Sequence, residues 1–506
     1  MHRRLGGGTS RRFAVLRIVA WASIRQFLGE RAAGVPEGLA GSMGSPSPSA
    51  GEKPFVACGR SVAADRLYGM HARTWTFLAV GLLGMTAAAK AKPIAFMGGD
   101  VLPISGRPIS PGTVIVIGGT IATIGPTAST PVPADAERID CSGKVIMPGL
   151  VDTHSHVGGG WGGDASGPMQ PDVRILDSIN VRDTGFRKAR AGGLTTLNIM
   201  PGSGHLLSGQ TIYAKLRKAS TIDDFFIRDA AGKPVGGIKM ANGTNSQKEP
   251  PFPGTRSKAA AIVRQKFLKA RDYRRKVTEA KGDAAKLPDR DLEMEALLEV
   301  LDGRVIVHHH CHRADDILTV LRLRDEFGFK VVLHHVSEAW KVADQLAKAA
   351  APCSVIVVDS PGGKIEAMDL SLATGGVLEK AGVPCAIHTD DPVTDSRLFL
   401  RTAGLAVRAG MSRDKALEAL TLAGARMLDL DGRIGSLDVG KDADLIILSG
   451  DPLSVRTKVL QTWIEGEKVF DREDPDDRLF AVGGFGAGRD QKAHACCTDE
   501  RFAETK

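Results

Sequence analysis

Two histidines separated by one residue end an apolar segment of the chain, Met147-Pro-Gly-Leu-Val-Asp-Thr-His-Ser-His156. Its composition predicts a short strand that begins after Pro148-Gly149. Side chains alternate faces along a strand, so His154 and His156 are expected to point to the same side at its end. Two converging imidazoles form half of a binding site for zinc or a similar divalent ion. A histidine pair on the surface is the simpler interpretation of this motif taken alone.

Four further strand-like segments carry residues that bind metals or handle protons. They are 236–241 with Lys239, 305–313 with His308, His310 and His312, 331–335 with His334 and His335, and 386–391 with His388, Asp390 and Asp391. Core histidines and buried turn carboxylates would explain each segment singly. Their joint position at the ends of predicted strands indicates one common site instead.

The central part of the chain alternates predicted strands with predicted helices. The strands are expected at 193–200, 236–241, 304–311, 330–336, 353–359 and 384–390. This alternation predicts a parallel α/β fold. Polar residues at the carboxyl ends of strands favour a (β/α)8 barrel, a TIM-like barrel whose chemistry lies on that face. A doubly wound sheet is the alternative, but its nucleotide-binding forms carry a glycine-rich phosphate loop, which 158–163 resembles only in composition.

Both ends of this central part are flanked by β-rich sequence. Residues 93–140 contain two β-rich runs joined by Gly118-Gly119, a pattern typical of a hairpin. Similar runs return at 433–448 and 461–470. We therefore expect one small β-sandwich domain built from both chain ends. The predicted division is 90–145 and 427–472 for this domain, 146–426 for the metal-binding barrel, which includes a helical insertion at 249–303, and 473–506 for a mobile tail.

The N-terminal residues predict export. Residues 70–89 have a basic start, a short apolar run and an Ala-x-Ala exit, which is typical of a secretory signal peptide. We interpret Met70 as the true translation start and 1–69 as a non-native, disordered extension. The protein is then exported, to the periplasm, without stable membrane association after signal removal. An internal apolar helix in a cytoplasmic protein is the alternative.

The charge distribution argues against a nucleic-acid partner. The formal net charge is +8, but residues 1–69 alone hold ten Lys/Arg and four Asp/Glu. The remaining chain is close to neutral, and it has no basic stripe with interleaved aromatic residues.

Three motifs resemble the metal-dependent amidohydrolase superfamily, in particular its imidazolonepropionase-like branch. They are 145–156, 310–317 and 435–445, and the resemblance covers about 93–470. It implies a distorted (β/α)8 barrel with a small β-sandwich. It also implies that one or two divalent metal ions, with Zn²⁺ as first choice, are bound by His154, His156, Lys239, His310, His335 and Asp390.

The roles of these residues follow from the same resemblance. His154 and His156 would bind the more buried ion, and Asp390 would be both a ligand and the general base. Lys239 corresponds to a lysine that some members carboxylate to bridge two ions, whereas other members hold one ion. His308 or His312 remain alternatives to His310, as do His334 to His335 and Asp391 to Asp390. His334 and His388 add imidazoles where many relatives have other residues.

The resemblance implies an amidohydrolase that cuts the C–N bond of a small-molecule amide, cyclic amide or peptide with a metal-activated hydroxide. A dipeptidase of the Xaa-Pro or a related type is one alternative, and a non-catalytic binding protein with this fold is another. Ligand completeness argues against the latter, because degenerate members lose the histidines or the aspartate. Assembly into a homo-oligomer stays open.

Overall fold

The computed structural model describes residues 92–159, 164, 166–358, 364–484 and 486–487. All of them belong to the second of two units of the chain, Met85–Lys506. The predicted extension at 1–69, the predicted signal peptide at 70–89 and most of the glycine-rich loop at 158–163 lie outside the described residues. Within the described part of the chain, no helix has the length and apolar character needed to cross a bilayer.

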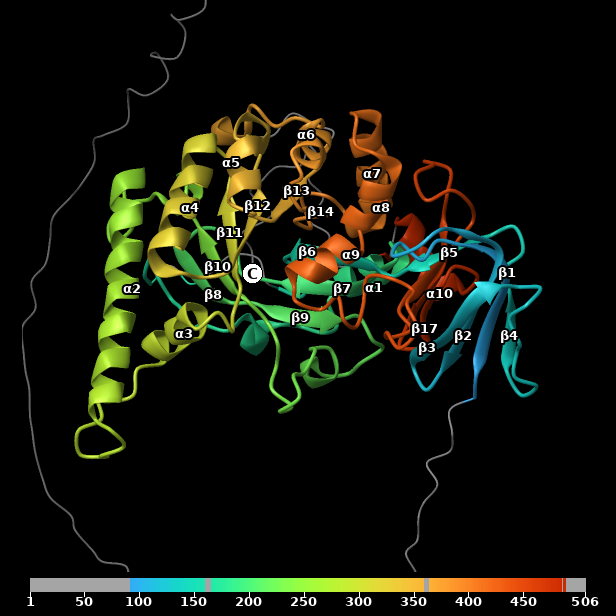
Figure 1. Ribbon diagram of the computed structural model, residues 1–506, viewed down its shortest axis with the longest axis horizontal. Coiled ribbons are helices and arrows are strands. Elements are labelled where there is room, and N and C mark those ends of the chain that lie inside the picture. Colours follow the sequence, from blue (N-terminus) through green and yellow to red (C-terminus); the bar gives the residue numbers. More distant parts are fainter. Residues whose placement is uncertain (1–91, 160–163, 165, 359–363, 485, 488–506) are drawn as a thin grey trace, which may run out of the picture. The chain divides into compact units, whose positions relative to one another are not determined.

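The small β domain combines strands from both ends of the described chain. Its strands are β1 (Ile94–Val101), β2 (Ile109–Ile117), β3 (Thr120–Pro126), β4 (Glu137–Asp140), β5 (Val145–Pro148), β15 (Leu445–Leu448), β16 (Val459–Ile464) and β17 (Glu467–Asp471). They are ordered β17-β16-β15-β5-β1-β2-β3, and β4 pairs with β1. Figure 1 shows the early and late strands side by side.

The two halves of β1 have different partners in this sheet. Residues 94–97 pair with β4, whereas Asp100 and Val101 pair with β5. Phe96 and Trp463 meet edge-to-face in the core with ring centroids 5.1 Å apart. The predicted hairpin is confirmed: β2 and β3 are antiparallel. Gly118 and Gly119 have φ values of +60° and +82°, which glycine adopts without strain.

The α/β part contains two sheets. Its strands are β6 (Leu150–Ser155), β7 (Leu194–Ile199), β8 (Leu207–Gln210), β9 (Ile212–Lys215), β10 (Ile238–Ala241), β11 (Val307–Cys311), β12 (Val331–His335), β13 (Cys353–Ile356) and β14 (Cys385–His388). One sheet has the order β14-β13-β12-β11-β10-β8, and the other has β6-β7-β9. The strands from β10 to β14 are parallel, as the alternating sequence predicts.

Backbone hydrogen bonds join the two sheets at both edges. On one side β8 and β9 are separated only by Thr211, whose N–H donates to the carbonyl of Gly237 at 2.8 Å. On the other side, the N–H of Asp390 donates to the carbonyl of His154 at 2.9 Å, and the N–H of His156 donates to that of Asp391 at 3.3 Å. These links connect the strands as a TIM-like barrel requires, and the α/β fold class is confirmed. One departure is that β8 and β9 run antiparallel to their neighbours.

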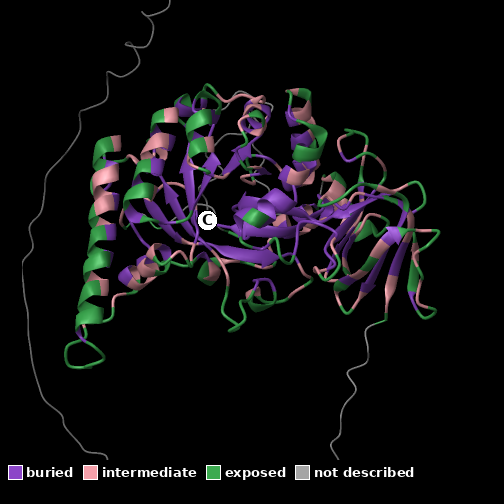
Figure 2. Ribbon diagram, in the orientation of Figure 1, coloured by how far each residue is buried: buried purple, intermediate pink, exposed green. Residues whose placement is uncertain are grey.

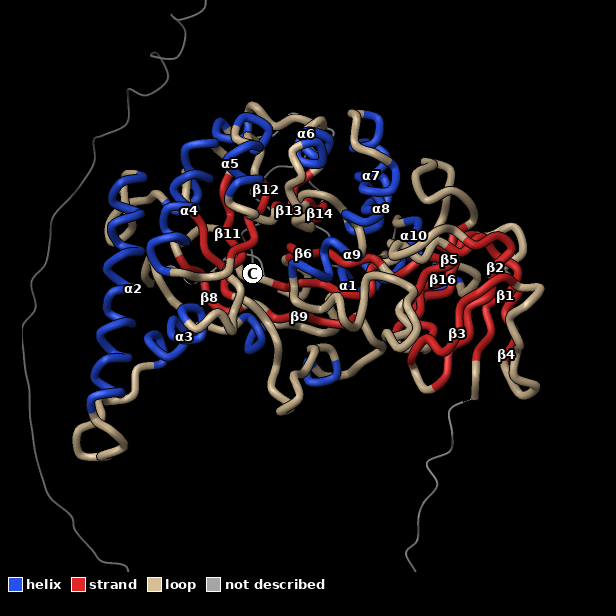
Figure 3. Tube along the Cα trace, in the orientation of Figure 1, coloured by secondary structure: helices blue, strands red, loops and turns tan. Residues whose placement is uncertain are grey.

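The described helices are α1 (Thr184–Ala191), α2 (Arg256–Glu279), α3 (Leu292–Leu301), α4 (Ala314–Phe327), α5 (Ala343–Lys348), α6 (Thr374–Lys380), α7 (Phe399–Arg408), α8 (Arg413–Ala419), α9 (Leu422–Met427) and α10 (Pro475–Val482). Most of the helices pack against these sheets, whereas α10 packs on α1 and β17. Figure 3 shows α4 to α7 along one side of β11–β14, and Figure 2 shows that the strands are buried whereas the outer helices are largely exposed. The predicted helical insertion at 249–303 is confirmed by α2 and α3.

The prediction that 473–506 is a mobile tail is wrong for its first residues. Asp474 accepts hydrogen bonds from the N–H groups of Asp476 and Asp477 and so begins α10. Phe480 of this helix is buried, and the guanidinium carbon of Arg187 lies 3.9 Å from the centre of its ring. A single aromatic anchor and a good N-cap explain why a sequence without clear periodicity forms a helix.

Candidate metal and catalytic site

The strand-end residues converge on Asp390, where β6 and β14 meet. His154 Nε2 lies 3.3 Å and His156 Nε2 lies 3.1 Å from Asp390 Oδ1. These three side chains offer ligand atoms that all lie within 4.8 Å of one another. The HxH geometry expected from strand alternation is therefore present, with both imidazoles directed at one carboxylate.

The backbone of β6 and β14 fixes this carboxylate and its histidines. Asp390 has a φ of +52°, an uncommon value outside glycine that costs about 1–3 kcal/mol. His156 Nδ1 lies 2.7 Å from the carbonyl oxygen of Met200, so this nitrogen donates and Nε2 is left to face Asp390. Burial raises the pKa of Asp390, but the neighbouring His156, His388 and Lys239 together bring it below its ordinary value.

Lys239 extends from β10 into the same centre. Its side chain is fully buried, and Nζ lies 3.0 Å from His154 Nε2. Burial lowers the pKa of Lys239 to about 7, although Asp390 opposes this shift. A large fraction of the amine is therefore neutral near pH 7, which is the form that reacts with carbon dioxide to give a carbamate.

His335 and His310 complete the group of sequence-predicted residues. His335 Nδ1 lies 3.9 Å from Asp390 Oδ2, and the rings of His310 and His335 are 4.4 Å apart. His335 Nε2 and both ring nitrogens of His310 are buried without a hydrogen-bond partner among the described residues. The structure thus brings all six predicted residues into one neighbourhood.

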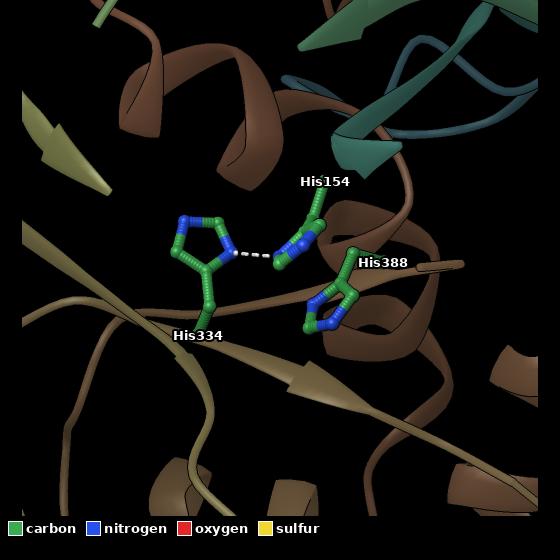
Figure 4. Close-up of side chains that lie close together, drawn as sticks. All are labelled: His154, His334 and His388. Carbon is green, nitrogen blue, oxygen red and sulfur yellow. Dashed lines mark hydrogen bonds between the residues drawn. The ribbon is translucent and has the colours of Figure 1, made fainter. Parts of the chain in front are cut away.

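A row of imidazoles supports His154 from inside the barrel. Figure 4 shows His154, His334 and His388 together. His334 Nδ1 lies 3.3 Å from His154 Nδ1, and its Nε2 lies 3.0 Å from His308 Nδ1. His308 Nε2 in turn lies 2.9 Å from the hydroxyl of Tyr213. His334 therefore contacts both His154 and His308, rather than Asp390.

His388 supports His335 in the same way. His388 Nε2 lies 3.1 Å from His335 Nδ1, and its Nδ1 lies 2.8 Å from the hydroxyl of Ser354. This leaves His335 Nε2 as the nitrogen available to a ligand. The extra imidazoles that the sequence analysis singled out are therefore placed where they orient other histidines.

The alternative carboxylate, Asp391, has a different environment. Its Oδ2 accepts hydrogen bonds from the N–H and hydroxyl of Ser396, at 2.9 and 2.5 Å. Burial raises the pKa of Asp391, whereas the Ser396 hydrogen bonds oppose this rise. It holds the segment after β14 in place, and the geometry favours Asp390 as the carboxylate of the site.

The electrostatics of the cluster suit a bound cation. Burial is the first cause that lowers the pKa of His154, His310 and His335 well below the ordinary value, and neighbouring cationic groups add to the effect. The imidazoles are consequently neutral at pH 7 and have lone pairs for a metal. Zinc prefers such nitrogen and carboxylate ligands, so the donor set of the site fits a divalent ion.

Two functional features escaped the sequence analysis. Asp152, within β6, accepts hydrogen bonds from the N–H and hydroxyl of Thr389 and from the N–H of His154, and so ties β6 to the end of β14. Glu366 offers a ligand atom beside His310 and His312. Asp152 adjoins the HxH motif and could have been noticed there, whereas no pattern around Glu366 distinguishes it from other acidic loop residues.

Comparisons with known proteins identify the family of the chain. A profile of the amidohydrolase family matches residues 228–470. The crystal structure of an amidohydrolase from Thermotoga maritima MSB8 is 35% identical and covers 75% of this chain and 100% of its own, with a TM-score of 0.71. An imidazolonepropionase from Rhizobium rhizogenes is 27% identical over 67% of this chain and 86% of its own length. Amidohydrolase tasK from Hapsidospora irregularis is 28% identical over 71% of this chain, which matches only 40% of tasK.

Proposed function

The chain belongs to the amidohydrolase family, in its imidazolonepropionase-like branch, and on this premise we propose that it hydrolyses the C–N bond of a small amide, cyclic amide or peptide with the help of a bound divalent ion. As a member of this family, the protein is a hydrolase of carbon–nitrogen bonds. The ion, the roles of individual residues and the substrate class are proposals.

One observation carries the proposal: two buried imidazoles from β6 and a carboxylate from the end of β14 meet at a single point. His154 Nε2 and His156 Nε2 lie 3.3 and 3.1 Å from Asp390 Oδ1. We propose that these three residues hold a Zn²⁺ ion, with His335, His310 and Lys239 around it. When bound, such an ion acts as a Lewis acid and lowers the pKa of a water molecule to about 7.

The residues of the chain then handle the proton. Asp390 is ionised, because its pKa is lowered despite its burial, and it accepts the proton of the attacking water. The oxygen of that water forms a bond with the substrate carbonyl carbon, and the C–N bond breaks. Asp390 transfers the proton to the departing nitrogen, which leaves as an amine. Each atom and charge is accounted for without a further reactant.

The direct test is the Asp390→Asn variant, with activity and metal content measured on the same samples. We expect turnover to fall by about 100-fold or more, because a general acid–base group contributes about 10²–10⁴-fold. Asp391→Asn is the matched control, since this neighbouring carboxylate contacts Ser396. We expect it to retain activity within about tenfold. A screen with N-acyl amino acids, cyclic amides and dipeptides supplies the substrate.

Near-normal turnover of Asp390→Asn with the substrate found in the screen would contradict the assignment. A protein that binds no divalent ion when it is purified, stripped and reloaded would contradict the metal-dependent mechanism. Activity on dipeptides alone would favour the dipeptidase alternative, and binding without turnover of any compound would favour a non-catalytic protein.

A further inference from the structure

A chain of buried polar contacts leads from His154 in β6, through His334 in β12 and His308 in β11, to Tyr213 in β9. The Nδ1 atoms of His154 and His334 lie 3.3 Å apart, and His334 Nε2 lies 3.0 Å from His308 Nδ1. His308 Nε2 lies 2.9 Å from the hydroxyl of Tyr213. All four side chains are buried, and Figure 4 shows the first link. The proposed function uses the His154 end of this chain and gives Tyr213 no role.

The hydrogen bonds of this chain can run in only two directions. Burial disfavours the charged form of an imidazole, and a neutral imidazole has one N–H donor and one acceptor nitrogen. Both nitrogens of His334 and both of His308 take part in links of the chain. Because the two nitrogens of a ring have opposite roles, reversal of one link requires reversal of the others. The direction at His154 is therefore coupled to the direction at Tyr213.

The hydroxyl of Tyr213 favours one of these directions. Its only hydrogen-bond partner among the described residues is His308, and its ring lies in an apolar cluster with Leu428. A buried donor without an acceptor is costly, so we expect the hydroxyl to donate its proton to His308 Nε2. His308 Nδ1 then donates to His334 Nε2, and His334 Nδ1 donates to His154 Nδ1.

This direction places the proton of His154 on Nε2. Asp390 Oδ1 lies 3.3 Å from that nitrogen and can accept its hydrogen bond. Lys239 Nζ lies 3.0 Å from it and can also accept, as an uncharged amine. Nε2 is the atom of His154 that the proposed function gives to the ion, and a protonated nitrogen has no lone pair for a metal. The chain therefore opposes metal binding at this nitrogen.

We propose that Tyr213 is a positioning residue that regulates metal binding: its hydroxyl holds the proton of His154 on Nε2, and a divalent ion binds there only when the whole chain reverses. In the reversed direction His154 Nδ1 donates to His334, and the Tyr213 oxygen accepts from His308. Each imidazole keeps one proton, on its other nitrogen, and the phenol keeps its own, so no proton is gained or lost. This role rests on the ion at His154 in the proposed function and names what sets the affinity for it.

The reversed chain leaves the proton of Tyr213 without an acceptor among the described residues, so the hydroxyl weakens the binding of an ion. Tyr213→Phe removes that proton and leaves one unpaired atom of His308 in either direction, which takes away the preference. We expect this variant to bind zinc about tenfold more tightly than the wild type, because one buried unpaired donor corresponds to about that factor. A variant that only disturbed the packing would bind zinc more weakly.

The affinity is measured at pH 8 by competition between the metal-free, full-length protein and a chelating indicator for zinc. This pH lies above the pKa of Lys239, which burial lowers to about 7, so its amine is uncharged. Tyr273→Phe is the matched control, since this partly buried tyrosine lies in α2 and outside the chain of contacts. We expect its affinity to stay within about twofold of the wild type. Circular dichroism and thermal unfolding verify that each variant is folded.

Two further measurements make the outcome specific. In the His334→Leu background the chain is interrupted, so we expect Tyr213→Phe to have no further effect on zinc affinity. Nitrogen NMR of the wild type, labelled with ¹⁵N-histidine, reports which ring nitrogen carries the proton, and the His334 signals are assigned from the His334→Gln variant. We expect the His334 proton on Nδ1 in the metal-free protein and on Nε2 once zinc is bound.

Three results would overturn this role of Tyr213. They are unchanged or weaker zinc binding by folded Tyr213→Phe, a tightening that persists in the His334→Leu background, and a His334 proton that stays on one nitrogen when zinc binds. If Tyr213→Phe does not fold, the NMR result on the wild type decides. A wild type that binds no zinc contradicts the proposed function and this role with it, whereas zinc binding that Tyr213→Phe leaves unchanged contradicts this role alone. Tighter binding that is lost in the double variant supports it.

Discussion

The burial of several histidines predicts how far the free energy of unfolding falls in acid. His309 is the clearest case. His309 is buried, and its Nδ1 lies 3.0 Å from the carbonyl oxygen of His310. Burial lowers the pKa of His309 from its ordinary value of 6.5 to about 4. The folded protein therefore keeps this imidazole neutral in a range where the unfolded chain takes up a proton.

The sign and size of the effect follow from this difference. Because the unfolded state binds more protons below pH 6.5, stability is fully present above that value and is lost as the pH falls towards 4. At pH 5 the loss is about 1.5 pKa units at 1.36 kcal/mol each, or about 2 kcal/mol from His309 alone. His308 and His388, both buried with pKa values of about 3, each add a similar amount. The sum of about 6 kcal/mol is comparable with a typical total stability of 5–15 kcal/mol.

The assay is urea unfolding of the metal-free protein between pH 7 and pH 5, for the wild type and for His309→Asn. Asparagine does not titrate in this range, and its amide can donate to the His310 carbonyl. We expect the variant to be less stable at pH 7, but to lose about 2 kcal/mol less than the wild type by pH 5. If the free energies of unfolding of the two proteins fell by the same amount between pH 7 and pH 5, the idea that His309 is buried in the neutral form would be refuted.

Two further predictions concern buried polar networks. Lys215 is fully buried and lies 3.2 Å from Asp444 and 3.0 Å from Glu465. We expect Lys215→Met to lower the free energy of unfolding by about 3–5 kcal/mol, because it leaves the buried carboxylate of Asp444 without an ion-pair partner; a change below 1 kcal/mol in urea unfolding would contradict this. We expect His334→Leu to weaken metal binding by about 10–100-fold, because the partner of His154 Nδ1 is lost. His334→Gln, which can still accept this hydrogen bond, should weaken it less, and equal affinities in calorimetry would contradict the role.

The sequence predicts the fold well where hydrophobic periodicity decides the structure. The strand expected at 193–200 is β7 at Leu194–Ile199, and that at 353–359 is β13 at Cys353–Ile356. These strands are buried on both faces, so their apolar runs are distinctive. The segment 207–215 was not predicted as strand, because Ser208, Gly209 and Gln210 interrupt its apolar character. Tertiary pairing with β7 and β10 forms β8 and β9 there.

The residues of the candidate site also differ in how far the sequence predicts them. His154 and His156 could be paired because their spacing on one strand directs them to the same side, whereas the choice of Asp390 over Asp391 came from the resemblance to the amidohydrolase family. Glu366 could not be predicted, because it lies in a short 3₁₀ turn, Ile365–Ala367, with no recognisable motif around it. The pairing of Asp316 with Arg256 depends on how α2, in the helical insertion, packs against α4.

The junction between β6 and β14 also determines the order in which the molecule can assemble. His154 and Asp390 are joined by a backbone hydrogen bond across more than 230 intervening residues. Contacts of such high sequence separation form late in folding, because the loop that they close must be ordered first. We therefore expect the proposed metal ligands to be among the last parts of the native structure to come together. Amide hydrogen exchange should be slower at Asp390 once zinc is present, because an ion that binds only the native state makes every opening of this junction rarer.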